Sequence, residues 1–159
     1  MLAFETFRHS TYSVQDGTVC IDGLDIFYRE AGPRTGPVVL LLHGPVTSVD
    51  MFRNLLPRLA SAFRLVAPDY PGYGQSSVPK HTELAYNCEN FLQLADKLVK
   101  ELRLSRYSLY LMDYGASVGY RLVPTRFVPS RTDAVLHHLR NRRGCERRPL
   151  APSLWAAET

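Results

Sequence analysis

The sequence predicts an α/β fold built on a mostly parallel, open sheet. Two observations carry this prediction. Short apolar runs alternate with longer segments whose apolar residues recur at helical spacing, which is typical of strands joined by right-handed crossover helices. A hairpin signal precedes the first of these units. We expect strands at residues 38–42, 63–67 and 107–112, and helices at residues 48–62 and 84–102 and from residue 115 onward.

The N-terminal hairpin is predicted by the dipeptide Asp22-Gly23, which separates two β-rich runs at residues 18–21 and 24–30. Asp-Gly accepts the positive φ angles that two-residue hairpin turns require. The second run alternates apolar and polar residues, so we expect one of its faces to be exposed.

The later elements follow from local patterns. Residues 38–42 read Val-Val-Leu-Leu-Leu between glycine and proline breakers, which favours a strand buried on both faces. Ser48 is the expected N-cap of a helix that runs to about Ala62. Residues 63–67 form the next strand, and apolar spacing predicts a long helix over residues 84–102.

The strand at residues 107–112 ends at a single carboxylate, Asp113, and the chain then passes through Gly115 into a helix. A buried strand, a sharp turn and a helix, in that order, are typical of an exposed nucleophile. A carboxylate in this position attacks carbon and forms a covalent ester. The alternative is an ordinary acid at a strand end that caps the following helix.

Three sequence blocks carry a family resemblance. They are VVLLLHG at residues 38–44 with TSVDMFRNLLPRLA at 47–60, FRLVAPDYPGYGQSS at 63–77, and YSLYLMDYGASVGYRL at 107–122. In this order the blocks resemble the α/β-hydrolase superfamily, in particular its epoxide hydrolase and haloalkane dehalogenase branch. The resemblance covers residues 12–122 and implies a partial α/β-hydrolase fold. It also implies hydrolysis of an epoxide or a carbon–halogen bond in a small-molecule substrate, through an aspartyl ester.

The resemblance assigns roles around the turn at Asp113. The backbone N–H after the nucleophile and a second N–H, from the turn after His43 and Gly44, normally hold the oxyanion. Pro45 has no N–H, so Val46 would have to replace it. Loss of one such donor costs about 3–4 kcal/mol of transition-state stabilisation. The expected site therefore consists of the nucleophile Asp113, the oxyanion backbone at Tyr114, Pro45 and Val46, and the structural turn residues His43, Gly44 and Gly115.

Other chemistries lack support in the sequence. Gly72-Tyr73-Gly74 resembles half of a phosphate loop, but no Lys-Ser or Lys-Thr pair follows it. The three cysteines, Cys20, Cys88 and Cys145, have no zinc spacing and are expected to be free thiols. We therefore expect no metal and no cofactor.

The family pattern stops after Leu122. The resemblance requires a second carboxylate, a histidine base, further strands and a lid, none of which is recognisable in the remaining sequence. Residues 121–159 carry 8 arginines against 3 acids, whereas residues 1–120 carry 11 basic and 12 acidic residues. We divide the chain into an N-terminal hydrolase part, residues 1–122, and a basic Arg/Pro-rich tail, residues 123–159, poorly ordered or with one short helix within residues 132–144.

This break suggests a truncated or frameshifted hydrolase. The nucleotide sequence would support a frameshift if another reading frame encodes a sixth strand and a histidine-bearing loop. Turnover is then incomplete, and the alternative is a non-catalytic α/β-hydrolase-like interaction fragment or pseudoenzyme. In the family the strand before Asp113 pairs with a further strand, so we expect self-association through an exposed sheet edge. Nucleic-acid binding by the arginines of the tail has no supporting motif. No apolar run reaches about 18 residues and no secretory signal pattern opens the chain, so we expect a cytoplasmic protein without membrane contact.

Overall fold

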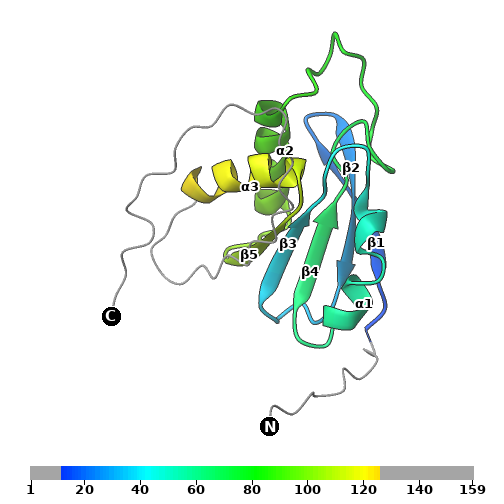
Figure 1. The fold of residues 1–159 in the computed structure, drawn as a ribbon, viewed down its shortest axis with the longest axis vertical. Coiled ribbons are helices and arrows are strands. Elements are labelled where there is room, and N and C mark those ends of the chain that lie inside the picture. The colour runs from blue at the N-terminus through cyan, green and yellow to red at the C-terminus, as the bar shows by residue number, and fades with distance from the viewer. Residues whose placement is uncertain (1–11, 126–159) are drawn as a thin grey trace.

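The computed structural model describes residues 12–125, which form a five-stranded sheet with helices on both faces (Figure 1). The strand order is β1-β2-β4-β3-β5. β3 pairs in parallel with β4 and with β5, whereas β2 pairs antiparallel with β1 and with β4. The predicted α/β class is therefore confirmed, with a mixed sheet. The elements are β1 (Gln15–Ile21), β2 (Leu24–Ala31), β3 (Val38–Leu42), η1 (Val49–Phe52), α1 (Leu56–Leu59), β4 (Arg64–Pro68), α2 (Cys88–Glu101), β5 (Tyr107–Leu111) and α3 (Tyr114–Thr125).

The predicted hairpin is confirmed. β1 and β2 pair from Gln15 opposite Glu30 to Ile21 opposite Leu24. Asp22 and Gly23 form the turn with φ of 54° and 81°. Both central residues have positive φ, as a type I′ hairpin turn requires.

The sheet separates two apolar layers, and β3 contributes to both. Leu40 and Leu42 face a cluster with α2 and α3, whereas Leu41 faces a second cluster with η1 and α1. In Figure 1 α2 and α3 lie together on one side of the sheet and α1 lies on the other. All three leucines are fully buried. The prediction of a strand buried on both faces is confirmed.

The predicted helix over residues 48–62 is wrong as a continuous element. The chain forms the short 3₁₀ helix η1 and, separately, the one-turn helix α1. Pro57 lies in the first turn of α1, where its missing N–H is tolerated, but within a longer helix it would break a backbone hydrogen bond. Ser48 does cap η1, because its hydroxyl accepts the N–H of Asp50 at 3.3 Å.

The other boundaries differ by a few residues. α2 begins at Cys88 rather than at residue 84, because the side chain of Asn87 caps it by accepting the N–H of Asn90 at 2.9 Å. β4 extends through Pro68, which pairs with Tyr28. The short helix predicted within residues 132–144 lies outside the described residues. No helix within residues 12–125 is long and apolar enough to cross a membrane.

Candidate active site

Asp113 lies at a sharp turn between β5 and α3 and has a φ of 48°. Positive φ is uncommon for residues other than glycine, and such strain gathers at functional sites. The turn is closed by two backbone hydrogen bonds, from Gly115 N–H to Met112 O at 2.8 Å and from Ala116 N–H to Asp113 O at 3.0 Å. Asp113 itself is exposed. The backbone thus holds a carboxylate in a fixed, accessible position.

Two glycines allow the Asp113 turn to lie directly against the end of β3. A Cβ at Gly115 would lie 2.3 Å from the carbonyl oxygen of Leu42. A Cβ at Gly44 would lie 3.0 Å from the Cβ of Asp113 and 3.5 Å from its Oδ2. Neither position has room for a side chain without movement. The turn after β3 and the carboxylate of Asp113 are therefore brought together as the sequence predicts.

His43 is fully buried, and both of its ring nitrogens are engaged. Nε2 accepts the N–H of Tyr70 at 3.1 Å, so Nδ1 carries the proton and donates it to the carbonyl of Gly44 at 2.7 Å. Burial lowers the pKa of His43, which the hydrogen bond to Gly44 and the nearby Asp69 partly oppose. His43 therefore braces the turn in its neutral form and has no lone pair available for a substrate.

Asp69 is a buried carboxylate that the sequence analysis did not single out. Its Oδ1 accepts the N–H of Val49 at 2.6 Å and its Oδ2 accepts the N–H of Gln75 at 2.9 Å. Oδ1 also lies 3.9 Å from Nε2 of His43, but that nitrogen is an acceptor, so the contact is not an ion pair. Asp69 thus links the loop after β4 to the segment that follows the Gly44 turn. An acid directly after a strand, at the start of a glycine-rich loop, was the available signal.

Ser76 extends this buried network to the hairpin. Its hydroxyl donates to the carbonyl of Asp69 at 2.8 Å and accepts the N–H of Phe27 at 2.9 Å. The glycine-rich loop therefore serves to tie β2 and β4 together. No feature of the described residues gives it a phosphate-binding role.

The turn after Gly44 departs from ordinary backbone geometry. Pro45 supplies no N–H. Val46 has a φ of 60°, and its side chain is 93 % exposed. A β-branched residue in this conformation is a genuine outlier. The two residues predicted to bear on the oxyanion thus lie in a strained turn directly after Gly44, which approaches Asp113.

Tyr114, the residue after Asp113, belongs to an aromatic cluster around Phe91. The ring of Tyr114 lies edge-on to Phe91 at 5.9 Å, and Tyr70 stacks on Phe91 at 4.9 Å. The hydroxyl of Tyr70 is buried without a hydrogen-bond partner, and burial raises the pKa of Tyr70 well above its usual value. This cluster anchors the start of α3 against α2.

The general base that the resemblance requires is not supplied within residues 12–125. Their histidines are His43, which is engaged, and His81, which lies exposed with its ring 4.9 Å from that of Tyr86. No group of three or more acidic, cysteine or histidine side chains in this part of the chain could hold a metal ion. His137 and His138 lie outside the described residues.

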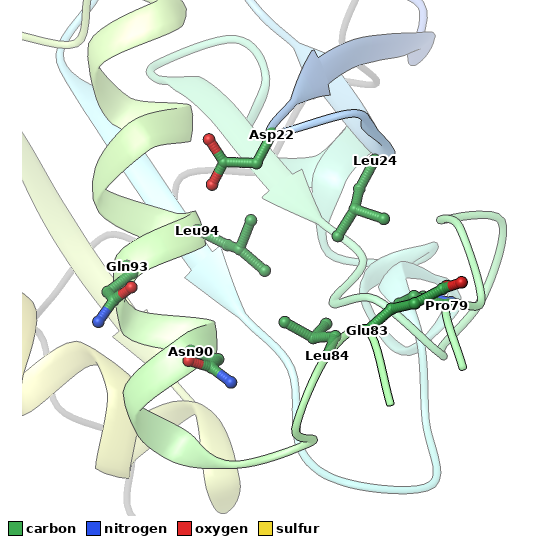
Figure 2. Close-up of a pocket in the computed structure, with 8 residues that line it drawn as sticks. All are labelled: Asp22, Leu24, Pro79, Glu83, Leu84, Asn90, Gln93 and Leu94. Atoms are coloured by element: carbon green, nitrogen blue, oxygen red, sulfur yellow. The ribbon is translucent and has the colours of Figure 1, made fainter. Parts of the chain in front are cut away.

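The described residues also form a surface cavity of about 380 Å³ (Figure 2). Figure 2 shows leucines at its base and polar side chains around them, contributed by the hairpin turn, the loop before α2 and α2 itself. Its acids already have partners, since Asp22 pairs with Lys97 and Glu83 accepts the N–H of Lys80. Neither Asp113 nor any residue of the Gly44 turn lines the cavity, so it is separate from the Asp113 site.

Comparison with known proteins agrees with this geometry. A family model described as alpha/beta hydrolase fold matches residues 37–135. The chain is 43 % identical over 103 residues to an uncharacterized hydrolase of Saccharomyces cerevisiae, covering 64 % of this chain and 34 % of that protein. It is 33 % identical over 104 residues to a haloalkane dehalogenase of Bradyrhizobium diazoefficiens, covering 65 % and 33 % respectively. The chain thus spans about a third of the length of these curated relatives.

Solved structures give the same result. The haloalkane dehalogenase DbeA of Bradyrhizobium elkanii matches with a TM-score of 0.68 at 32 % identity, over 72 % of this chain and 38 % of that one. A bacterial membrane phospholipase A matches with a TM-score of 0.67 at 24 % identity, which shows the fold alone. The family model covers more than half of the chain, from the strand before His43 to beyond the helix after Asp113. The chain belongs to the α/β-hydrolase fold family.

Proposed function

We propose that this chain carries the nucleophilic part of a hydrolase that opens an epoxide or a carbon–halogen bond through an ester on Asp113. The observation that carries the proposal is the exposed carboxylate of Asp113, held at a φ of 48° against Gly44. The similarity to haloalkane dehalogenases supports it.

In the first step an oxygen of the Asp113 carboxylate attacks a carbon of the substrate and forms a C–O bond. In an epoxide the ring C–O bond breaks and the released alkoxide takes up a proton, whereas a haloalkane loses a halide ion. In the second step water attacks the carbonyl carbon of the ester. The N–H groups of Tyr114 and Val46 stabilise the oxyanion of the tetrahedral intermediate. The bond from the carbonyl carbon to the alkoxy oxygen then breaks, and the alcohol leaves with one proton from the attacking water. The other proton passes to a base or to solvent, and the Asp113 carboxylate is regenerated.

The second step needs a base to activate the water. His43 cannot serve, because both of its nitrogens are engaged. If no residue outside the described range supplies a base, the ester accumulates. We therefore expect this chain to complete the first step and to stall before the second.

Intact mass spectrometry tests the proposal after incubation with styrene oxide or with a primary alkyl bromide. The expected mass increase equals one epoxide molecule, or one alkyl group less the displaced proton. Asp113→Asn should abolish it. Asp50→Asn is a matched control, because Asp50 is an exposed acid that forms an ion pair with Arg29 and is remote in sequence from Asp113. A wild-type chain that neither forms an adduct nor turns over the substrate, or an adduct that persists in Asp113→Asn, would refute the proposal.

Self-association remains a prediction. β5 ends the strand order within residues 12–125, but Tyr107 and Tyr110 on this strand are not without partners. Sedimentation velocity over a range of concentrations decides the question, and a monomer throughout would refute it. The division of the chain at residue 122 and a cytoplasmic location likewise remain predictions. The non-catalytic alternative, an interaction fragment, predicts no adduct on Asp113.

A further inference from the structure

The four residues Gly44 to Thr47 form a turn whose third residue is unsuited to it. Pro45 occupies the second position and Val46 the third, with a φ of 60°. Proline followed by a residue of positive φ is the pattern of a type II turn, which normally has glycine at the third position. Holding valine there costs on the order of 1–3 kcal/mol. Other contacts must therefore hold this turn in place.

A side chain closes the turn. Residues 45–46 form a turn, but among the described residues no hydrogen bond of good geometry joins the N–H of Thr47 to the carbonyl of Gly44. Instead, the Thr47 hydroxyl donates to that carbonyl oxygen at 2.8 Å. Nδ1 of His43 donates to the same oxygen at 2.7 Å, and the Thr47 hydroxyl lies 3.5 Å from this nitrogen. Both lone pairs of the Gly44 carbonyl are thus occupied, which fixes the orientation of the following peptide.

This turn lies beside the nucleophile. Gly44 approaches Asp113 so closely that an added Cβ would be 3.0 Å from the Cβ of Asp113. Because Pro45 has no N–H, Val46 provides the first backbone donor after Gly44. The N–H of Val46 makes no hydrogen bond to another described residue. Its direction is set only by the conformation of the turn.

We propose that Thr47 is a positioning residue, whose hydroxyl closes the strained turn and aims the Val46 N–H at the oxyanion that forms on the Asp113 ester. This inference rests on the proposed function. Formation of the ester creates no oxyanion on Asp113, whereas attack on the ester does. Thr47 therefore acts on the decay of the ester and has little influence on its formation.

The test follows both steps separately. The Asp113 adduct is formed with styrene oxide and is then treated with hydroxylamine. The nitrogen of hydroxylamine attacks the ester carbonyl, a C–N bond forms and the C–O bond to the alcohol breaks. The alcohol leaves with a proton from that nitrogen, and Asp113 becomes a hydroxamate. Mass spectrometry gives both rates for the wild type, Thr47→Val, Thr47→Ser and the matched surface control Thr18→Val.

In Thr47→Val, which lacks the hydroxyl, we expect the adduct to decay roughly 10- to 100-fold more slowly, somewhat less than the loss from removing an oxyanion donor outright. Thr47→Ser retains the hydroxyl and should restore the decay rate, and Thr18→Val should match the wild type. The rate of adduct formation should stay close to the wild-type rate in all three variants. Circular dichroism confirms that each variant is folded.

Several results would overturn the inference. Equal decay in Thr47→Val and the wild type would do so, as would formation and decay that fall in equal proportion, since that result indicates general damage to the site. If Thr47→Val does not fold, the decay of the wild-type adduct is compared in the native protein and in urea. The inference requires faster decay in the native protein, and equal or slower native decay refutes it. A wild type that neither forms an adduct nor turns over styrene oxide refutes the proposed function and this inference with it.

Discussion

Replacement of Gly115 by alanine tests the close approach on which the site depends. The new Cβ would lie 2.3 Å from the carbonyl oxygen of Leu42 and 2.9 Å from that of His43. Carbon and oxygen atoms without a conventional hydrogen bond ordinarily stay about 3.3 Å apart, so the start of α3 or the end of β3 must move by roughly 1 Å. Both obstacles are backbone atoms, which cannot rotate away.

Overpacking of this kind costs about 1–3 kcal/mol, and the contact with backbone places Gly115→Ala near the upper end. The better helix propensity of alanine returns about 0.5–1 kcal/mol. We therefore expect a loss of about 2 kcal/mol in the free energy of unfolding. For a folded region of this size, that lowers the Tm by roughly 8 °C.

Urea unfolding followed by circular dichroism measures this loss. Gly119→Ala is the comparison, because its Cβ would meet the Cδ2 of Leu111 at 2.2 Å, the end of a flexible side chain that can change rotamer. We expect a net loss of less than about 1 kcal/mol there. If Gly115→Ala unfolds at the same urea concentration as the wild type, the Asp113 turn does not lie against the end of β3 as described.

Three further predictions concern single groups. Val46→Gly should raise the free energy of unfolding by about 0.5–1 kcal/mol, because it relieves the strain at a φ of 60°. Val78→Gly, at another exposed valine, should lower it. If urea unfolding shows that Val46→Gly is less stable than the wild type, Val46 is not strained. Tyr70→Phe should leave stability unchanged or raise it by up to about 1 kcal/mol, because the buried hydroxyl has no partner; a clear loss on thermal unfolding would reveal one. Burial lowers the pKa of His43 below its ordinary 6.5, so the unfolded chain takes up a proton on this ring at a higher pH than the folded protein does. The free energy of unfolding should therefore be unaffected by His43 above pH 6.5 and should fall as the pH drops from 6.5 towards the folded-state pKa. An NMR titration midpoint above 6.5 would contradict this.

The parts of the fold that could be predicted from the sequence are those determined by residues close together in the chain. Asp22-Gly23 determines the hairpin turn, and the continuous apolar run at Leu40 to Leu42 requires burial on both faces. Apolar spacing alone did not reveal the break in the helix over residues 48–62. Met51, Phe52, Leu55 and Leu56 do face one apolar cluster, but Pro57 interrupts the backbone hydrogen bonds beneath that face. The apolar spacing therefore predicted the buried face correctly, but it wrongly predicted one continuous helix.

The site divides in the same way. Asp113, Gly44 and Gly115 were recognisable because each follows a strand within a few residues. The position of Asp69 directly after a strand was a usable signal, but the contacts of Asp69 and Ser76 were hidden, because their partners Val49 and Phe27 lie 20 and 49 residues away in the chain. No short pattern encodes such contacts, which depend on how three loops meet at one end of the sheet. The strain at Val46 was also hidden, since a β-branched residue gives no signal of positive φ.

Peptide mapping of the styrene oxide adduct identifies the carboxylate that attacks the substrate. We expect one modified peptide, with fragment ions that place the added mass on Asp113 and not on the exposed acids Asp50 or Glu83. Hydroxylamine should then convert Asp113 to a hydroxamate. An adduct spread over several surface carboxylates, or one located on Cys88 or His81, would show that Asp113 is not a nucleophile.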